Sequence, residues 1–487
     1  MTRTTKARRS AGILALSVLL IASLGTSDCD DASGPFPNII VIIADDLGWA
    51  DVGYHGSAIE TPNLDALAAG GVRFENFHAQ AWCSPARAAF LTGRFPPGFA
   101  WHVPGIRTDS EFGIDASEYT IAERLRDAGY ATGLIGKWHQ GTRPESHPNR
   151  NGFDYFYGFL GGYIGFYYKA SYLGPHDWQR NGVEIFDELE YATTLLGEDA
   201  VRFVRERDPA EPFFLTLSFN APHFPQQAPQ EAIDKYAATS DCQFSRCAYM
   251  AQVDVMDQEI GRLVDTLEDE GIRENTLIVF FSDNGGALAF GGSNAPLRGQ
   301  KLDTYEGGIR VPALMNWPAV LAEGQVRDQL ILVSDLYSTL EAAAGLGRRA
   351  PAYSRNALMT AVWNAPLERD PTFFMSRAAE TSPVARSRAL ITGDWKLVVT
   401  DPEAVGAEST AELFRITDDP GEQRDVSRTY AGLMPLLRFM LERAESGLAA
   451  AESSPRQGPG RLARVRTPPA PPALAPPTTA LRPGRAA

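Results

Sequence analysis

The hydrophobic pattern of the chain predicts buried strands that alternate with amphipathic helices. Residues 38–44 form a continuous apolar, mostly β-branched run, which is typical of a strand covered on both faces. Similar runs follow at 131–135, 213–219, 276–281 and 311–316. Helices are predicted between the strands, at 119–128, 193–207 and 247–270. The alternation predicts an α/β fold with a mostly parallel central sheet flanked by helices.

The pattern changes after residue 347. Residues 389–400 predict a hairpin that turns at Gly393 and Asp394, residues 413–416 predict another strand, and residues 425–447 predict a terminal helix. The proline-rich sequence that follows has too little hydrophobic mass to form a core. The predicted organisation is therefore a signal peptide at 1–27, a main domain at 37–347, a small C-terminal sheet-plus-helix subdomain at 348–450, and a disordered proline-rich tail at 451–487.

The first residues of the chain predict export. Residues 1–10 carry four basic side chains and no acid, and residues 11–24 form an apolar run too short to span a bilayer. The protein is therefore expected to be periplasmic or secreted. The pair Arg8 and Arg9 leaves a twin-arginine route open beside the general one. A lipoprotein anchor at Cys29 is disfavoured because Asp28 stands where a small residue is needed.

Composition and charge narrow the partners. The 487 residues are 44% hydrophobic and 22% charged, as in an ordinary globular protein. The formal net charge is −15, but both ends of the chain are basic, and the residues between them carry −25. This acidic body argues against nucleic acid as a partner. An anionic substrate would need a locally positive pocket, because the overall field opposes its approach.

The cysteines raise a chemical question. Only four occur, and in an oxidising compartment Cys242 and Cys247 could close a small loop, which leaves Cys83 without an obvious partner. The stretch AWCSPARAAFLTGR predicts a helix that begins at Cys83 and stops at Gly93. Arg87 would lie on the same helix face, so that the helix dipole and the guanidinium would favour an anion at the thiol. The alternative is an ordinary buried cysteine.

Two acidic pairs follow predicted strands. Asp45 and Asp46 come directly after the first strand, and Asp283 and Asn284 come after the strand at 276–281. Ligands bind beyond the carboxyl ends of strands in open parallel sheets, so the pairs could converge at one rim. Their oxygens suit Ca²⁺ or Mg²⁺ better than zinc. The alternative is that these residues only form turns.

Cationic and imidazole side chains occupy similar positions. Lys137 and His139 follow one predicted strand, His223 follows another between two prolines, and Arg298 and Lys301 lie further along the chain. A single lysine is usually a solvated surface group, and a single histidine usually has a structural role. Together, however, these side chains and the oxygen ligands are what an active site for a dianionic group needs.

These motifs resemble those of the sulfatase family, within the alkaline-phosphatase-like superfamily. The sequence CSPAR followed by LTGR, at 83–94, is similar to the family signature that directs oxidation of the cysteine to formylglycine (3-oxoalanine). Further motifs that match in order and spacing are ADDLGWADVGYHG, GKWHQG, APHFP, FSDNGG and PLRGQKLDTYEGGIRVP. The motifs GDWKLV and ELFRITDDPGEQRDVS resemble the family's small subdomain, so the resemblance covers roughly residues 37–448.

The resemblance implies a role for each site residue. One divalent cation, Ca²⁺ with Mg²⁺ as the alternative, would be held by Asp45, Asp46, Asp283, Asn284 and the modified Cys83. Arg87 would orient the formylglycine and His139 would assist there; Lys137 and Lys301 would bind sulfate oxygens; His223 would protonate the leaving oxygen; Arg298 has weaker support.

The implied activity is hydrolysis of sulfate esters, as in an arylsulfatase or a carbohydrate sulfatase. A formylglycine hydrate made from Cys83 would be the nucleophile. The partners would be a sulfated small molecule or carbohydrate as substrate, and a formylglycine-generating enzyme during maturation. The sequence does not indicate which ester is cleaved, whether action is exo or endo, or the oligomeric state.

Two rival hypotheses are less favoured. The first is a phosphodiesterase or phosphonate monoester hydrolase on the same scaffold, but two-zinc members of that group need further Asp and His ligands, and the chain has only seven histidines. The second is a non-catalytic relative that binds an anion, which would be expected to have lost a ligand or the cysteine. The aromatic-rich stretch at 153–178 could form a wall for a sugar or aryl group, or an ordinary packed loop.

Overall fold

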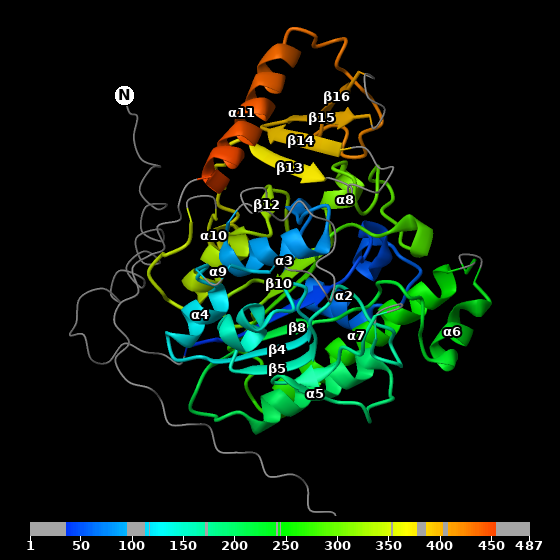
Figure 1. Ribbon diagram of the computed structural model, residues 1–487, viewed down its shortest axis with the longest axis vertical. Helices are drawn as coiled ribbons and strands as arrows, with labels where there is room; N and C mark the ends of the chain where they lie inside the picture. Colours follow the sequence, from blue (N-terminus) through cyan, green and yellow to red (C-terminus); the bar gives the residue numbers. More distant parts are fainter. Residues whose placement is uncertain are drawn as a thin grey trace, which may run out of the picture. The chain divides into compact units, whose positions relative to one another are not determined.

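The central sheet of the computed structural model has ten strands in the order β11-β2-β10-β9-β1-β8-β4-β5-β6-β7 (Figure 1). Its neighbours β9, β1, β8, β4 and β5 are parallel, whereas β10 is antiparallel to β9. The bounds are β1 Asn38–Ala44, β2 Val72–Phe74, β4 Ala131–Lys137, β5 Tyr155–Phe159, β6 Gln179–Arg180, β7 Val183–Glu184, β8 Phe213–Ser218, β9 Thr276–Ser282, β10 Ala313–Asn316 and β11 Gln325–Arg327. The α/β fold with a mostly parallel central sheet is confirmed.

The structure describes residues 36–94, 113–115, 117–170, 174–239, 242–243, 245–351, 354–376, 386–402 and 408–453. These residues belong to one compact unit. The predicted signal peptide, Cys29 and the tail beyond Ser453 lie outside the described residues. Within the described residues, no helix has the length and apolar character needed to cross a membrane.

Helices cover both faces of the sheet, which explains why β1 has no polar face. Ile39, Val41 and Ile43 pack into one core, and the alternate residues of β1 pack into the other. One face is covered by α2 Pro62–Ala69, α5 Ala192–Glu206, α6 Gln230–Ala237 and α7 Arg246–Asp269, and the other by α3 Cys83–Thr92, α4 Ile121–Arg126, α9 Asp335–Ala343 and α10 Leu358–Trp363 (Figure 1).

Short elements complete the main domain. β3 Phe77–His78 and β12 Ile331–Leu332 pair as a two-stranded sheet. The remaining short helices are η1 Trp49–Asp51, η2 Gly53–His55, η4 Pro144–Ser146, η5 Pro148–Arg150, η6 Leu288–Phe290 and α8 Glu306–Ile309. The predicted helix at 193–207 matches α5, and the predicted helix at 247–270 matches α7, within one residue at both ends. The strand predicted at 131–135 continues to Lys137, so Lys137 ends β4 instead of following it.

The C-terminal subdomain is a four-stranded antiparallel sheet with one helix. Its strands are β13 Thr372–Ser376, β14 Arg386–Thr392, β15 Trp395–Asp401 and β16 Thr410–Arg415, in sequential order. One face packs on the main domain through residues such as Phe374 and Val398, and the other packs on α11 Met434–Ser453 (Figure 1). The hairpin predicted at Gly393 and Asp394 is the β14–β15 connection.

The start predicted for the terminal helix is wrong. Residues 425–433 form turns, and α11 begins at Met434. The carboxylate of Asp425 accepts hydrogen bonds from the backbone N–H groups of Leu413, at 3.0 Å, and Ser427, at 2.8 Å. These bonds hold the segment beside β16, and a helix cannot begin there. At its other end α11 includes residues 451–453, which the sequence pattern places in the tail.

The cysteine pairing that the sequence left open is decided by the structure. Cys242 and Cys247 form a disulfide at the start of α7. Cys83 is free and buried at the start of α3.

Candidate active site

The carboxyl ends of β1, β4, β8 and β9 form one rim of the sheet. Asp45 and Asp46 follow β1, Lys137 ends β4, and Asp283 and Asn284 follow β9. The backbone N–H of Asp45 donates to Ala221 O at 3.0 Å, and that of Asp283 donates to Ala44 O at 3.1 Å. The parallel pairing of the strands therefore brings together residues that lie 239 positions apart at most, from Asp45 to Asn284.

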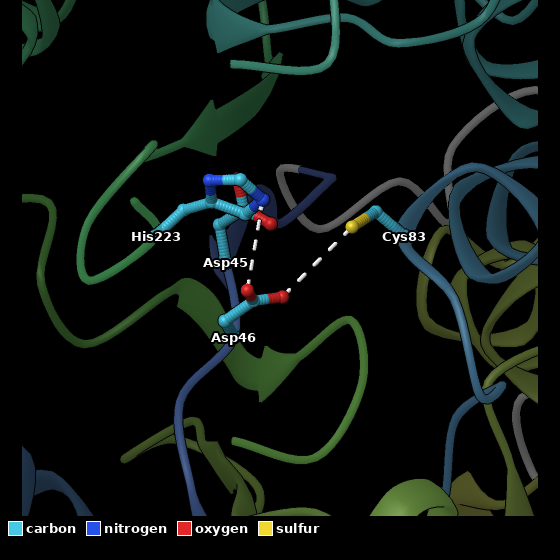
Figure 2. A group of neighbouring side chains, drawn as sticks. All are labelled: Asp45, Asp46, Cys83 and His223. Atoms are coloured by element: carbon cyan, nitrogen blue, oxygen red, sulfur yellow. Dashed lines mark hydrogen bonds and ion pairs between the residues drawn. The ribbon is translucent and has the colours of Figure 1, made fainter. Parts of the chain in front are cut away.

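Asp46 lies at the centre of this rim. Its carboxylate accepts from Asn284 Nδ2 at 2.7 Å and from Lys301 Nζ at 2.8 Å, and its Oδ2 lies 3.6 Å from His223 Nε2 (Figure 2). Burial alone would raise the pKa of Asp46, but the charge of Lys301 and the hydrogen bonds from Lys301 and Asn284 hold it below its ordinary value. Asp46 is thus an ionised carboxylate in a buried position.

The backbone of Asp46 is held in an unusual conformation. Its φ of 68° lies in the left-handed region, which is unfavourable for a residue with a Cβ. The hydroxyl of Tyr249, on α7, donates to Asp46 O at 3.1 Å, and the Asp46 N–H donates to Asp283 Oδ1 at 3.3 Å. The conformation is therefore maintained by contacts with distant elements.

Several oxygens at the rim could hold a metal ion. Asp45 Oδ2 accepts from Lys137 Nζ at 2.6 Å, while Asp45 Oδ1 and Asn284 Oδ1 are buried and have no partner among the described residues. The ligand atoms of Asp45, Asp46, Cys83 and His223 all lie within 4.8 Å of one another (Figure 2). Partnerless buried oxygens are rare, and the carboxylate and carboxamide oxygens of this group fit a hard divalent cation.

Asp283 is bound differently from the other two carboxylates. Arg87 donates a hydrogen bond from Nε to the Oδ2 of Asp283 at 2.9 Å, and Arg87 Nη2 forms an ion pair with the same oxygen at 2.7 Å. Burial and then the charge of Asp45 raise the pKa of Asp283, in spite of Arg87. Arg87 also donates to Lys137 O at 3.1 Å and to the Ser218 hydroxyl. The guanidinium therefore links α3 to the ends of β4, β8 and β9.

Cys83 begins α3 as predicted, and its thiol is not itself an anion. Its Sγ lies 3.9 Å from Asp46 Oδ1 (Figure 2). Burial and then the charge of Asp283 raise the pKa of the Cys83 thiol well above its ordinary value. The hydrogen bonds of Arg87 go to Asp283, Lys137 and Ser218 instead. The thiol at this position is therefore neutral and a poor nucleophile.

His139 is buried beside the same rim. Neither ring nitrogen has a partner among the described residues. Burial, followed by the charges of Lys137 and Arg87, lowers the pKa of His139 well below its ordinary value. A Cβ on Gly162 would lie 2.8 Å from His139 Nε2, so only glycine leaves room for the imidazole there. His139 is thus a neutral imidazole with two nitrogens available for a ligand.

His223 is paired with Lys301. Its Nδ1 lies 2.7 Å from Phe224 O and must carry the proton, so its Nε2 accepts from Lys301 Nζ at 3.0 Å. Burial and then the Lys301 ammonium lower the pKa of His223 to about 3. The ring of Tyr163 stacks on the imidazole with centroids 5.6 Å apart. Lys301 therefore keeps its proton and donates a hydrogen bond to a neutral His223.

Arg298 does not join this group. Its guanidinium donates to both Glu412 oxygens, at 2.9 and 3.2 Å, and lies 4.0 Å from the Tyr305 ring centroid. Glu412 belongs to β16, so Arg298 connects the main domain to the small sheet. The weaker suggestion that Arg298 acts in the site has no support in the structure.

Four residues near the site were not predicted from the sequence. The Ser218 hydroxyl accepts a hydrogen bond from Arg87 and donates one to Lys137 O at 2.8 Å. Ser218 ends a hydrophobic strand, so the sequence pattern does not mark it as a site residue. Asn220 is buried at the end of β8 with no partner for its carboxamide among the described residues. Gly162 and Tyr163 belong to the aromatic-rich stretch, whose composition was the only signal.

The fold is an α/β fold with helices on both faces of its sheet, and the site is a buried group of carboxylates, cationic side chains and one cysteine at the carboxyl ends of the strands. The sulfatase family model matches residues 37–346, and the chain belongs to that family. Arylsulfatase J of Mus musculus is 36% identical over 311 residues, which cover 62% of this chain and 52% of that protein. N-acetylgalactosamine-6-sulfatase of Homo sapiens is 39% identical over 334 residues, which cover 64% of this chain and 62% of that protein.

A solved structure is similar over more of the chain. The crystal structure of Ps i-CgsB in complex with k-i-k-neocarrahexaose is 33% identical, with a TM-score of 0.77. The match covers 84% of this chain and 93% of that one. The similarity therefore includes most of the fold and not only the motifs at the rim.

Proposed function

We propose that this protein hydrolyses sulfate esters of carbohydrates. Its nucleophile would be a formylglycine hydrate made from Cys83, and its metal cofactor would be one divalent cation, Ca²⁺. The observation that carries the proposal is the meeting of Cys83 with three carboxylates and three cationic side chains at one buried rim. Family membership supports the reaction class. The hexosamine sulfatase among the relatives and the oligosaccharide bound to Ps i-CgsB support a carbohydrate substrate.

The cation would be held by Asp45, Asp46, Asp283, Asn284 and the modified Cys83. The partnerless Oδ1 atoms of Asp45 and Asn284 are available without breaking a hydrogen bond. A bound divalent cation would offset the repulsion among the carboxylates and make a coordinated hydroxyl more acidic. Arg87 keeps Asp283 oriented toward the rim through one hydrogen bond and an ion pair.

The raised pKa of Cys83 supports a modified residue. A neutral, buried thiol is poorly suited to attack sulfur, whereas the hydrate of a formylglycine at this position would supply a hydroxyl nucleophile and a second hydroxyl to expel sulfate afterwards. Its precursor must be free of a disulfide, and Cys83 is. His139, a neutral imidazole whose ring nitrogens have no partner among the described residues, would assist at the formylglycine through its unprotonated nitrogen.

The cationic side chains would bind the sulfate. Lys137 and Lys301 each contact one carboxylate of the rim, and their ammonium groups would offset charge on the sulfate oxygens in a site of low dielectric. The leaving oxygen would lie beside the Lys301–His223 pair and would take its proton from this hydrogen-bonded pair. This local cluster is needed because the body of the protein is strongly acidic.

Export and maturation complete the proposal. The Cys242–Cys247 disulfide is expected in an oxidising compartment, which supports a periplasmic or secreted protein. A formylglycine-generating enzyme would act on the segment around Cys83.

The test combines mass spectrometry with sulfate release. The peptide that contains Cys83 should be about 18 Da lighter than the thiol form, because sulfur is replaced by an aldehyde oxygen. Sulfate release from 6-sulfated N-acetylgalactosamine should stop with chelator and return with Ca²⁺. Unmodified cysteine in fully active protein, or faster release of phosphate from a matched phosphate ester, would contradict the proposal.

A further inference from the structure

Three aromatic rings extend outward from His223, and they come from three separate segments. Tyr163, in the loop after β5, stacks on His223 at 5.6 Å with an interplanar angle of 18°. Its ring lies 6.1 Å from that of Phe224, and Phe224 lies 5.0 Å from Phe290, the last residue of η6. We call Tyr163, Phe224 and Phe290 the aromatic row; it begins at the Lys301–His223 pair.

The row is accessible, unlike most of the aromatic-rich stretch. Phe290 is 40% exposed and its neighbour Leu288 is 50% exposed. By contrast, the described part of the stretch at 153–178 is mainly packed into the core, because many of its rings are fully buried, namely Phe153, Phe156, Phe159, Phe166 and Trp178. Tyr163 is half-buried and stacks on His223 at the active site. Neither reading of this stretch was therefore complete.

We propose that the aromatic row binds the sugar ring that carries the sulfate, an inference that rests on the proposed function. The bridging oxygen of the ester must lie beside the Lys301–His223 pair, so the rest of the alcohol extends on the side where Tyr163 and Phe224 lie. The apolar C–H face of a pyranose packs well on aromatic faces.

Charge favours a sugar ring in this position over a second sulfate group. The row consists of uncharged side chains, and in the proposed function Lys137 and Lys301 are occupied by the sulfate that is cleaved. A sulfate next to the row would lose its hydration without gaining a cation. The row should therefore select the carbon skeleton of the substrate, and the cationic rim should select its sulfate.

The row is held in place before any substrate arrives. Gln252, on α7, donates to His223 O at 3.3 Å and to Pro225 O at 3.2 Å, which fixes the backbone on both sides of Phe224. The N–H of Leu288 donates to Gln300 Oε1 at 3.0 Å, which ties η6 to the segment that carries Lys301. A preformed surface loses little entropy when it binds a ligand.

The variant Phe290→Ala tests the row. The Phe290 side chain is exposed, and its ring packs against Phe224 and not against a ring of the proposed catalytic residues. For 6-sulfated N-acetylgalactosamine, KM should rise about 3- to 10-fold, as expected for the loss of one stacking contact. The inhibition constant of inorganic sulfate, which needs only the cationic rim, should stay within 2-fold of wild type. Phe290→Tyr, which keeps the aromatic ring, should have the KM of the wild-type protein.

The matched control is Phe439→Ala, which removes an exposed phenylalanine (57%) from α11. It should change neither constant. If Phe290→Ala leaves KM unchanged, or if it weakens inorganic sulfate as much as the ester, the aromatic row is not a sugar site. If the wild-type protein releases no sulfate from any ester, the proposed function fails first and this inference fails with it.

Discussion

Two clusters of buried charge in this protein differ in what they leave accessible. The rim cluster contains Asp45, Asp46, Asp283, Arg87, Lys137 and Lys301. The second, which we call the inter-sheet cluster, contains Glu306, Glu422, Lys396, His78 and Arg310, between α8 and the small sheet. Lys396 Nζ lies 2.7 Å from Glu306 Oε1 and 2.9 Å from Glu422 Oε1.

The comparison shows that balanced buried charge does not by itself make a site. In the inter-sheet cluster the side chains of Lys396, Glu306, Glu422 and His78 are fully buried and only that of Arg310 is exposed, by 14%; Glu422 Oε1 accepts no hydrogen bond but forms an ion pair with Lys396. In the rim cluster Lys301 is 16% exposed beside His223, which is 13% exposed, and Asp45 Oδ1 has neither a hydrogen bond nor an ion pair among the described residues. The inter-sheet cluster therefore fastens the small sheet to the main domain, whereas the rim cluster can receive a ligand.

The most severe change should be Cys83→Ala, which separates chemistry from stability at the rim. Without a nucleophile precursor, kcat should fall on the order of 10⁴-fold or more. The free energy of unfolding should change by about 1 kcal/mol, since only one buried sulfur atom is lost. Sulfate release and urea denaturation measure the two effects. Substantial residual turnover would show that Cys83 is not the source of the nucleophile.

Matched lysine substitutions test whether metal binding distinguishes the clusters. Lys137→Met leaves Asp45 unpaired, and Lys396→Met leaves Glu306 and Glu422 without their lysine; each should lower stability by about 3–5 kcal/mol in chelator. Ca²⁺ should recover a substantial part of the loss for Lys137→Met, because a cation at the rim can replace the lost charge. It should recover nothing for Lys396→Met. Equal recovery in denaturation curves would refute the distinction.

The pH dependence of stability tests the inter-sheet cluster further. Burial, partly offset by Lys396, raises the pKa of Glu422 from 4.5 to about 7. The folded protein then binds more protons than the unfolded chain between these values, so this group's contribution to stability falls as pH rises through that range. Glu422→Gln should lose the fall, a difference on the order of 1–3 kcal/mol. Parallel stability curves for the two proteins would contradict it.

The smallest effect is expected at Arg298, which lies in neither cluster. Its ion pair with Glu412 is partly exposed, so Arg298→Lys should cost less than about 1 kcal/mol of stability. If Arg298 has no catalytic role, kcat and KM for a sulfate ester should stay within about 3-fold of wild type. If Arg298→Lys lowered kcat as much as Lys301→Met does, Arg298 would have a role in catalysis.

Local sequence patterns predicted much of the fold. The central strands and the helices α3, α5 and α7 have patterns that depend only on neighbouring residues and on burial of one or both faces, and their bounds lie close to those observed. The predicted start of α11 was wrong because Asp425 accepts a hydrogen bond from the backbone of β16, twelve residues earlier in the chain. The helix preference of residues 425–447 contains no information about that contact.

The candidate site divides in the same way. Its residue types and their positions at strand ends are visible in the sequence, because parallel strands bring their carboxyl ends to one rim. The partner of each residue is not, since Arg87 bonds Asp283 instead of stabilising a thiolate, and Lys301 pairs with both Asp46 and His223.

The sequence by itself determined which groups this protein can bring to a sulfate ester, because strand ends and turn residues are set by local pattern. Only the tertiary structure decided which carboxylates are paired, why the Cys83 thiol is neutral, and that Tyr163 reaches the site while Phe159 and Phe166 are buried. The physical reason is that pKa, burial and ring stacking depend on atoms that approach from remote parts of the chain.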